Sequence, residues 1–419
     1  MGAADIPRKR WARILPAVFL MYCINMIDRN NIGFAFPGME ADLGIGATYA
    51  GLAGGIFAIG YLFLQIPGGL WAERWSAKKL IFFALLAWGA FAMCTGFIHT
   101  VTQLLVVRFL VGFAEGCILP AIVLLLKRWF PLSERARASG FWMLSIPFAA
   151  MVMSPLCGFI LTHTTWRAMF IIEGLLPIVF AVIWWFAIED HPRDARWLSA
   201  EEREYLEKAA EEEGKRIDQP RNVPIFKAML TRNVILLILI WFLTQTGFAG
   251  YSIWLPTMMK SLTGGSEMLV GWLTSLPWLI AMIMLVLNSR HSDKTGERRF
   301  HVIVPAVVSA LFLLASTLLA GHEMLTAAVI SLICCGGLIQ CYYGIWWTIP
   351  TTFLTAEVLA VTLGAINAIG NLGGFFGPWL FGYFKDVTQS SVGGMAFLVT
   401  ASIVAPLLLL LLRQEPREK

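Results

Sequence analysis

Apolar stretches that are each long enough to cross a lipid bilayer recur twelve times along this chain of 419 residues. Hydrophobic residues make up 58% of the sequence and the mean hydropathy is +0.70, values that are not typical of a soluble protein. A backbone inside lipid must satisfy its own hydrogen bonds, so each stretch predicts an α-helix. The predicted spans are 11–36, 47–72, 79–98, 102–127, 137–162, 167–188, 233–259, 268–289, 302–320, 325–353, 358–384 and 391–412. The expected fold class is an all-α membrane protein with twelve transmembrane helices.

Positive charges are distributed unevenly between the predicted loops. If both termini are cytoplasmic, 27 of the 32 Lys and Arg residues fall in cytoplasmic segments. Arg167, Lys260 and Lys385 lie outside, and Arg29 and Arg108 lie within helices. This is the positive-inside bias, and it predicts the orientation in what we expect to be a bacterial inner membrane. The net charge of +5 then indicates contact with lipid headgroups and not with nucleic acid. The first span follows basic residues but has no small-residue cleavage site, so we expect it to be retained.

Two loops about 220 residues apart repeat one pattern of an acid, a base, a small residue and a basic pair. They run from Gly69 to Lys79 and from Ser289 to Arg299. Such duplication is typical of carriers built from two six-helix halves. We therefore expect domains at 1–188 and 232–419. The loop residues expected to act in conformational change are Gly69, Glu73, Arg74, Lys78, Asp293 and Arg298.

The residues between the two halves, 189–231, form the only long polar stretch. Ser199, followed three residues later by Glu202, has the pattern of a capping box that opens a charged helix, which we expect to end near Lys215. This segment is expected to be a cytoplasmic linker.

Four charged residues lie deep inside the predicted spans of the first half: Asp28, Arg29, Arg108 and Glu115. Each costs roughly 2.5–3.5 kcal/mol on insertion, so their presence predicts a function. Arg108 and Glu115 are seven residues apart and share one helix face. An arginine fork suits a carboxylate, and a buried acid suits proton coupling. The alternative is a permanent ion pair, Asp28 with Arg108 or Arg29 with Glu115, that only joins helices.

Other polar residues in the spans of the first half fit structural roles. Glu173 lies near the outer end of the sixth span, and we expect an interfacial structural acid, with a role in proton coupling as the alternative. The seven cysteines all fall within spans, without the spacing of disulfides or metal ligands. We expect no metal, no cofactor and no catalytic residue.

The second half carries no Asp, Glu, Lys or Arg inside its predicted spans. It carries aromatic and amide side chains instead: Trp241, Gln245, Tyr251, Gln340, Tyr342, Tyr343, Trp346, Trp347, Asn367 and Asn371. We expect the first half to handle charge and protons and the second half to shape the substrate site.

The paired loops resemble those of the major facilitator superfamily, over essentially the whole chain. Three further motifs, Asp28–Ala35, Asp194–Arg203 and Asn367–Phe375, resemble the anion:cation symporter family. Members of that family carry sugar acids, tartrate, phthalate, hydroxyphenylacetate and similar anions. The resemblance implies that the first and fourth helices border a central cavity, and that the paired loops tether neighbouring helices in one state of the cycle.

By this resemblance, Arg29 and Arg108 match anion-binding arginines, and Asp28 and Glu115 match protonation sites. The remaining candidates for substrate binding are Tyr61, Gln245, Trp347 and Asn367. One departure from the family's pattern is Met26, which stands where sugar-acid carriers tend to have a tyrosine. A second is Trp241, which stands where a hydrogen-bonding side chain is expected. Both favour a less hydroxylated anion.

The expected function is import of an organic carboxylate by proton symport, with protons, the anion and lipid as partners and a single chain as the working unit. An exchanger or facilitator without proton coupling is the first alternative. A membrane enzyme or sensor is the second, and the absence of nucleophile motifs, phosphate loops and metal-ligand spacing argues against it.

Overall fold

The structure is a computed structural model that describes residues 9–216, 231–350 and 356–412. The first half contains α1 (Lys9–Asn30), α2 (Ile32–Leu43), α3 (Ala47–Arg74), α4 (Ala77–Thr95), α5 (Val101–Glu115), α6 (Ile118–Trp129), α7 (Leu132–Met143), α8 (Ser145–His163) and α9 (Trp166–Ala187). A short 3-10 helix, η1 (Pro192–Asp194), and α10 (Ala200–Arg216) follow. The second half contains α12 (Arg232–Thr263), α13 (Glu267–Thr295), α14 (Phe300–Gly321), α15 (Leu325–Ile339), α16 (Tyr343–Trp346), α17 (Ala356–Gly370), α18 (Gly373–Thr388), α19 (Ser391–Leu408) and the 3-10 helix η3 (Leu409–Leu411).

Within the described residues, 11 helical segments are long and apolar enough to cross a membrane. They correspond to eleven of the twelve predicted spans. The remaining span, 358–384, is α17 followed by α18. Some spans are two helices in tandem: α1 gives way to α2 at Asn31, and α5 gives way to α6 just after Glu115. The all-α fold with membrane-spanning helices is confirmed.

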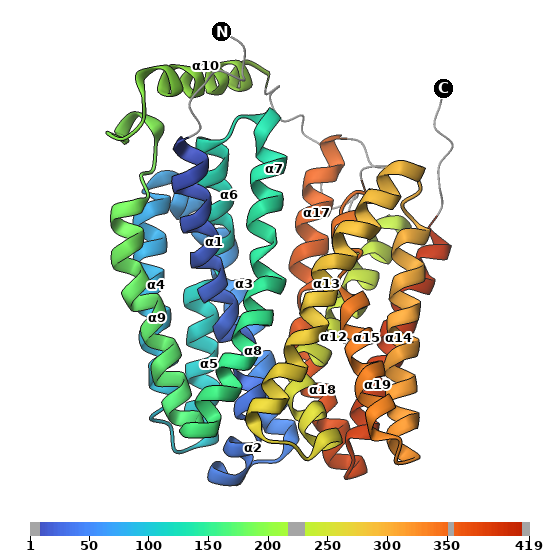
Figure 1. Cartoon of the computed structure of the whole chain (residues 1–419). Helices are drawn as coiled ribbons and strands as arrows, with labels where there is room; N and C mark the ends of the chain where they lie inside the picture. Colours follow the sequence, from blue (N-terminus) through green and yellow to red (C-terminus); the bar gives the residue numbers. More distant parts are fainter. Residues whose placement is uncertain (1–8, 217–230, 351–355, 413–419) are drawn as a thin grey trace.

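The two halves lie side by side (Figure 1), with α1 to α9 in one and α12 to α19 in the other. Helix α10 lies across one end of the first half, and α2 lies at the opposite end. We call these ends the α10 face and the α2 face. Across the boundary, α3 packs along α18 and α8 packs along α13.

The halves are closed against each other toward the α2 face. A Cβ atom on Gly51 of α3 would lie 2.2 Å from the carbonyl oxygen of Pro378 in α18, so only glycine permits this approach. Hydrogen bonds across the boundary, from Ser252 to Asn30 and from Thr48 to Asp386, lie on the same side. One hydrophobic cluster spans both halves here, whereas two clusters toward the α10 face each belong to one half. The described contacts therefore seal the α2 side of the boundary.

Helix α10 is held against the first half by buried charges. Arg10 of α1, only 2% exposed, donates to Glu202 of α10 at 2.6 Å and to Glu134 of α7 at 2.7 Å. The predicted helix start is right, because the Glu202 backbone N–H donates to Ser199 Oγ at 3.2 Å. The second hydrogen bond of a capping box, from the Ser199 backbone N–H to the Glu202 side chain, does not form, because that side chain binds Arg10 instead. The end of the helix, Arg216, matches the prediction, and residues 217–230 of the linker lie outside the described residues.

Candidate functional site

The charged residues of the first half converge from two helices. Arg29 Nε, at the end of α1, donates to Glu115 Oε2, at the end of α5, at 3.1 Å. Glu115 is fully buried, and the Arg29 side chain is 24% exposed. Of the two ion pairs weighed from the sequence, this one forms. It leaves the pair neutral overall, which is how two charges can lie inside an apolar bundle.

Arg108 and Asp28 meet differently. Arg108 Nη1 donates to the backbone carbonyl of Asp28 at 3.0 Å, and its Nε donates to the carbonyl of Ala53 at 3.4 Å. The Asp28 carboxylate accepts hydrogen bonds from the Trp88 indole and from Asn31 Nδ2. Both Arg108 and Asp28 are 1% exposed. The arginine therefore anchors the end of α1 through its backbone and does not pair with the acid side chain.

Aromatic rings of α3 lie against both guanidinium groups. The Arg29 guanidinium carbon lies 4.5 Å from the ring centre of Tyr61 and 5.3 Å from that of Phe57. Arg108 lies 5.4 Å from the same Phe57 ring. Tyr61, a predicted substrate-binding residue, is thus adjacent to Arg29. Phe57 was missed, although its spacing of four residues from Tyr61 puts both on one helix face.

Three polar atoms of this group have no hydrogen-bond partner in the described part of the chain. They are Nη2 of Arg29, Nη2 of Arg108 and Oε1 of Glu115, and all three are buried. Unpaired buried donors are costly. Two guanidinium donors without partners are suited to receive the oxygens of a carboxylate.

The substrate candidates of the second half form a network of their own. Gln245 Oε1 accepts from the Tyr343 hydroxyl at 2.8 Å, and Gln245 Nε2 donates to Asn371 Oδ1 at 3.2 Å. Asn371 Nδ2 in turn donates to Asn367 Oδ1 at 3.0 Å. The ring of Trp241 connects this network to Trp347, whose ring centre is 4.9 Å away. Gln245, Asn367 and Trp347 therefore gather in one place, with Tyr343 and Asn371 as the residues that join them.

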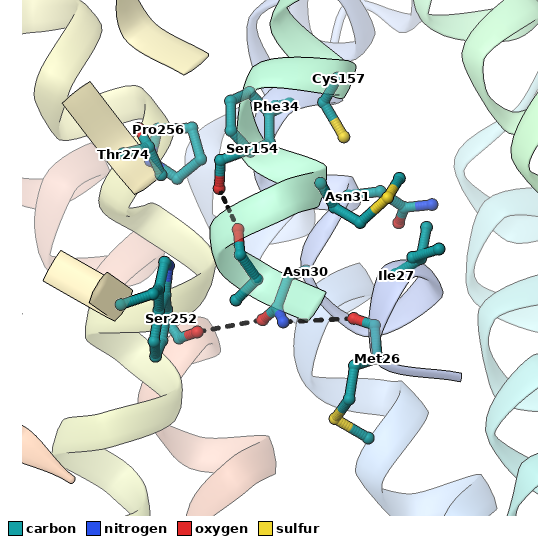
Figure 2. A pocket seen from close by; sticks show the side chains of 13 residues that line it. Met26, Ile27, Asn30, Asn31, Phe34, Ser154, Cys157, Ser252, Pro256 and Thr274 are labelled. Atoms are coloured by element: carbon teal, nitrogen blue, oxygen red, sulfur yellow. Dashed lines mark hydrogen bonds between the residues drawn. The ribbon is translucent and has the colours of Figure 1, made fainter. Parts of the chain in front are cut away.

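The end of α1 links the two halves. Consecutive residues there take partners on opposite sides: Asn30 Oδ1 accepts from Ser252 of α12 at 3.0 Å, and Asn31 Nδ2 donates to Glu173 of α9 at 2.7 Å. Figure 2 shows Asn30 directed toward Ser252 and Asn31 directed away from it, on the side of Cys157. Asn30, Asn31, Ser252 and Cys157 line a small cavity between the halves, together with Met26 and other side chains.

The prediction that Glu173 is interfacial is wrong. Its side chain is 1% exposed, and it accepts hydrogen bonds from Asn31 at 2.7 Å and from Cys157 at 3.2 Å. Its position along α9 was judged correctly, but the side chain faces α1 and α8 instead of the membrane surface. Asn31, 142 residues away in the sequence, and Cys157 of the preceding helix cover it.

The residues of the repeated loops lie at the α10 face. Lys78 pairs with Glu189 at 2.9 Å, which connects the start of α4 to the end of α9. Asp293 pairs with Arg298 at 2.6 Å in the second loop. Glu73 and Arg74 are exposed, and Gly69 lies one helical turn before Glu73 on α3. In each loop, the ion pair therefore joins two residues of the same half.

The sequence is similar to that of bacterial transporters along almost its full length. A protein of Agrobacterium vitis named for tartrate transport is 34% identical, over 99% of this chain and 93% of that one. The quinolone resistance transporter of Acinetobacter baumannii is 30% identical, over 94% of this chain and 92% of that one. The inner membrane transport protein RhmT of Escherichia coli K12 is 31% identical, over 97% and 95%.

Solved structures share the fold at low sequence identity. A D-xylose-proton symporter superposes with a TM-score of 0.77 at 16% identity, covering 97% of this chain and 99% of that one. A bacterial homologue of the lysosomal transporter Spinster, in an inward-facing conformation, gives 0.76 at 18% identity over 98% and 100%. The family model of the Major Facilitator Superfamily matches residues 18–378. The chain is therefore a multi-pass membrane protein of the major facilitator superfamily, with relatives of the anion:cation symporter type.

Proposed function

We propose that this protein imports an organic carboxylate together with protons by alternating access. The observation that carries the proposal is the pair of guanidinium groups of Arg29 and Arg108, each with a buried Nη2 donor that has no hydrogen-bond partner among the described residues. A carboxylate that accepts from both would satisfy two buried donors at once. Similarity to a relative named for tartrate transport supports the same class of substrate.

The proton enters the proposal through Glu115. In the ion pair, Glu115 neutralises Arg29. A substrate anion that takes over Arg29 would leave the Glu115 charge uncompensated in a fully buried position, so protonation of Glu115 would accompany substrate binding. Anion and proton would then bind cooperatively, and a proton gradient could drive accumulation. Asp28, hydrogen bonded to Trp88 and Asn31, is the second proposed proton site.

The proposed orientation has the α10 face in the cytoplasm. The distribution of Lys and Arg supports it, because 27 of 32 fall on that side. The contacts that close the α2 side would then make this an inward-facing state, with the substrate site isolated from the outside. The second half would supply the walls of the site through Gln245, Trp347 and Asn367.

The test is transport by purified protein in proteoliposomes, with radiolabelled tartrate as the first substrate and a panel of aromatic and hydroxylated carboxylates as competitors. Uptake should rise above the equilibrium level when the outside is made acidic relative to the inside. An ionophore that collapses the pH gradient should abolish the accumulation. Uptake that ignores the gradient but responds to carboxylate loaded inside would establish an exchanger instead.

A further inference from the structure

A second buried acid lies beside Asp28 and has no part in the function proposed so far. Glu173 Oε2 accepts from Asn31 Nδ2 at 2.7 Å, and the same Nδ2 donates to Asp28 Oδ1 at 3.3 Å. The two carboxyl groups come from α1 and α9 and share one amide group between them. Both are 1% exposed.

No cation accompanies Glu173. Its other oxygen accepts from the Cys157 thiol of α8 at 3.2 Å, and within the described residues it makes no ion pair and no further hydrogen bond. The titratable groups that face it are Asp28 from α1 and Cys157 from α8, while α4 contributes Trp88, which binds Asp28. Arg108 binds the backbone of Asp28 and not Glu173. Two buried carboxylates beside a single amide cannot both hold a charge without a large cost, so their protonation is coupled.

The Asn31 side-chain amide lies between the two acids and can change its hydrogen bonds when one of them is protonated. Asn31 Nδ2 faces both carboxyl groups, and Asn31 Oδ1 is buried without a hydrogen-bond partner in the described part of the chain. A protonated carboxyl group would donate its O–H, and only Oδ1 of this amide can accept it. A rotation of the Asn31 side chain that exchanges the two atoms would therefore suit the protonated form of either acid.

The same residues lie next to the boundary between the halves. Asn31 and Cys157, the two donors to Glu173, line the cavity of Figure 2, which has room for about one water at ≈ 10 Å³. Ser252 of α12 closes this cavity from the other half through its hydrogen bond to Asn30. When the halves part on the α2 side, the cavity opens toward that side, and water gains access to the acid pair.

We propose that Glu173 is a third proton-carrying residue of the transport cycle, which forms with Asp28 one acid pair bridged by Asn31. The pair takes up its proton from the α2 side. The covalent change is a single O–H bond, formed on one carboxyl group when a proton arrives from water and broken when it leaves. This inference deepens the proposed proton symport and rests on it.

The decisive measurement is an infrared titration of the purified protein, because protonated carboxyl groups absorb separately from ionised ones and no substrate is needed. The variants are Glu173→Gln and Asp28→Asn, with Glu267→Gln as the matched control, since Glu267 pairs with Lys260 at the end of the boundary. In a coupled pair, only the acid that loses its proton last ionises next to a charged neighbour. When the other acid is neutralised, this last acid should titrate about one pH unit lower, because the repulsion from a like charge is gone. Glu267→Gln should shift neither acid.

Both variants are measured, because the acid that ionises first in the wild type is not shifted by loss of the other, and Glu173→Ala and Asp28→Ala replace a variant that does not fold. Unchanged titration of the remaining acid in both folded variants would overturn the acid pair. The proposed transport is judged separately on the wild-type protein in proteoliposomes. If the wild type accumulates substrate against its gradient but the infrared titration shows no coupling between the two acids, the proposed symport is supported and Glu173 has no part in it.

Discussion

Arg29 donates to Glu115 across the gap between α1 and α5, so the proposed anion-binding group and a proposed proton site neutralise each other. By this proposal, a substrate carboxylate would compete with the acid for Arg29. This competition is a physical basis for coupling, because the displaced acid is fully buried and is stable there only when it is paired or protonated.

The first prediction concerns Glu115 and Asp28. Glu115→Gln imitates the protonated acid, so exchange of labelled for unlabelled substrate should persist while uptake driven by a pH gradient disappears. Asp28→Asn should behave similarly and should also weaken binding, because it alters the carboxylate that holds Trp88 and Asn31. Counterflow and gradient-driven uptake in proteoliposomes distinguish the two modes. If both variants still concentrate substrate, protons are not coupled through these acids.

The second prediction concerns the shape of the anion-binding group. Arg108→Lys keeps the charge but loses the planar fork, and a lysine cannot reproduce the bonds to the carbonyls of Asp28 and Ala53 together with one to substrate. We expect a loss of about 2 kcal/mol in binding, roughly thirtyfold, measured by ligand-induced thermal stabilisation. Arg193→Lys, at a side chain that is 72% exposed, serves as the control. Near-normal affinity of Arg108→Lys would assign this arginine a structural role.

The third prediction concerns the closure at the α2 face. Asp386 of α18 accepts from the backbone N–H groups of Ala47 and Thr48 at 3.0 and 2.7 Å, at the start of α3. Asp386→Ala removes these charge-assisted bonds between the halves, and about 1.5 kcal/mol would shift the population roughly tenfold toward opening on this side. The reporter is Thr274→Cys, a buried position in the cavity between the halves, which should react faster with a maleimide.

The control for this experiment is Asp42→Ala, because Asp42 binds Trp166 on the same face but within one half. It should leave the reporter's reaction rate unchanged. Equal rates in Asp386→Ala and the unsubstituted reporter would show that these bonds do not hold the halves closed.

The fourth prediction concerns the attachment of α10. Arg10→Ala leaves Glu202, which is fully buried, without its cation, a change that costs about 3–5 kcal/mol when a buried pair loses one member. Hydrogen exchange in residues 200–213 should accelerate strongly, while Arg196→Ala, at an exposed arginine, should have little effect. Unchanged exchange would mean that α10 is held by its other contacts, such as the ion pair between Arg135 and Glu213.

The fifth prediction concerns orientation. Single cysteines at His163, at the end of α8, and at Lys208 of α10 should react with a membrane-impermeant reagent from opposite sides of the membrane, in a chain freed of its own seven cysteines. His163→Cys should be labelled in intact cells and Lys208→Cys only after permeabilisation. Labelling of both from one side would disprove the proposed topology.

The sequence was sufficient for the spans and for the charged residues because both depend on local properties. Hydropathy along the chain locates helices, and charge inside an apolar run is visible without any contact. It could not decide which acid pairs with Arg29, because that depends on how α1 is rotated against α5. The turn of about 100° between adjacent helix residues does explain why Asp28 and Arg29 take different partners.

Contacts between distant segments account for the two errors. The Ser199 capping pattern is local, but Arg10 lies 192 residues from Glu202 and binds the side chain that the pattern requires. For Glu173, the position along α9 predicted its depth in the membrane but not the direction of its side chain. Its burial depends on Asn31 and on Cys157 of another helix. In both cases a buried acid accepts a hydrogen bond from a residue far away in the sequence, 192 residues for Glu202 and 142 for Glu173.

The separation of charge between the halves has a consequence for how such proteins diversify. All four membrane-embedded charges of the site belong to the first half, while Gln245, Trp347 and Asn367 of the second half are uncharged. By this proposal, substitutions in α12, at the end of α16 or in α17 can alter which acid fits without changing the groups proposed to hold the carboxylate and the proton. Related carriers could therefore evolve to transport a different substrate while they keep the same residues for binding the carboxylate and the proton.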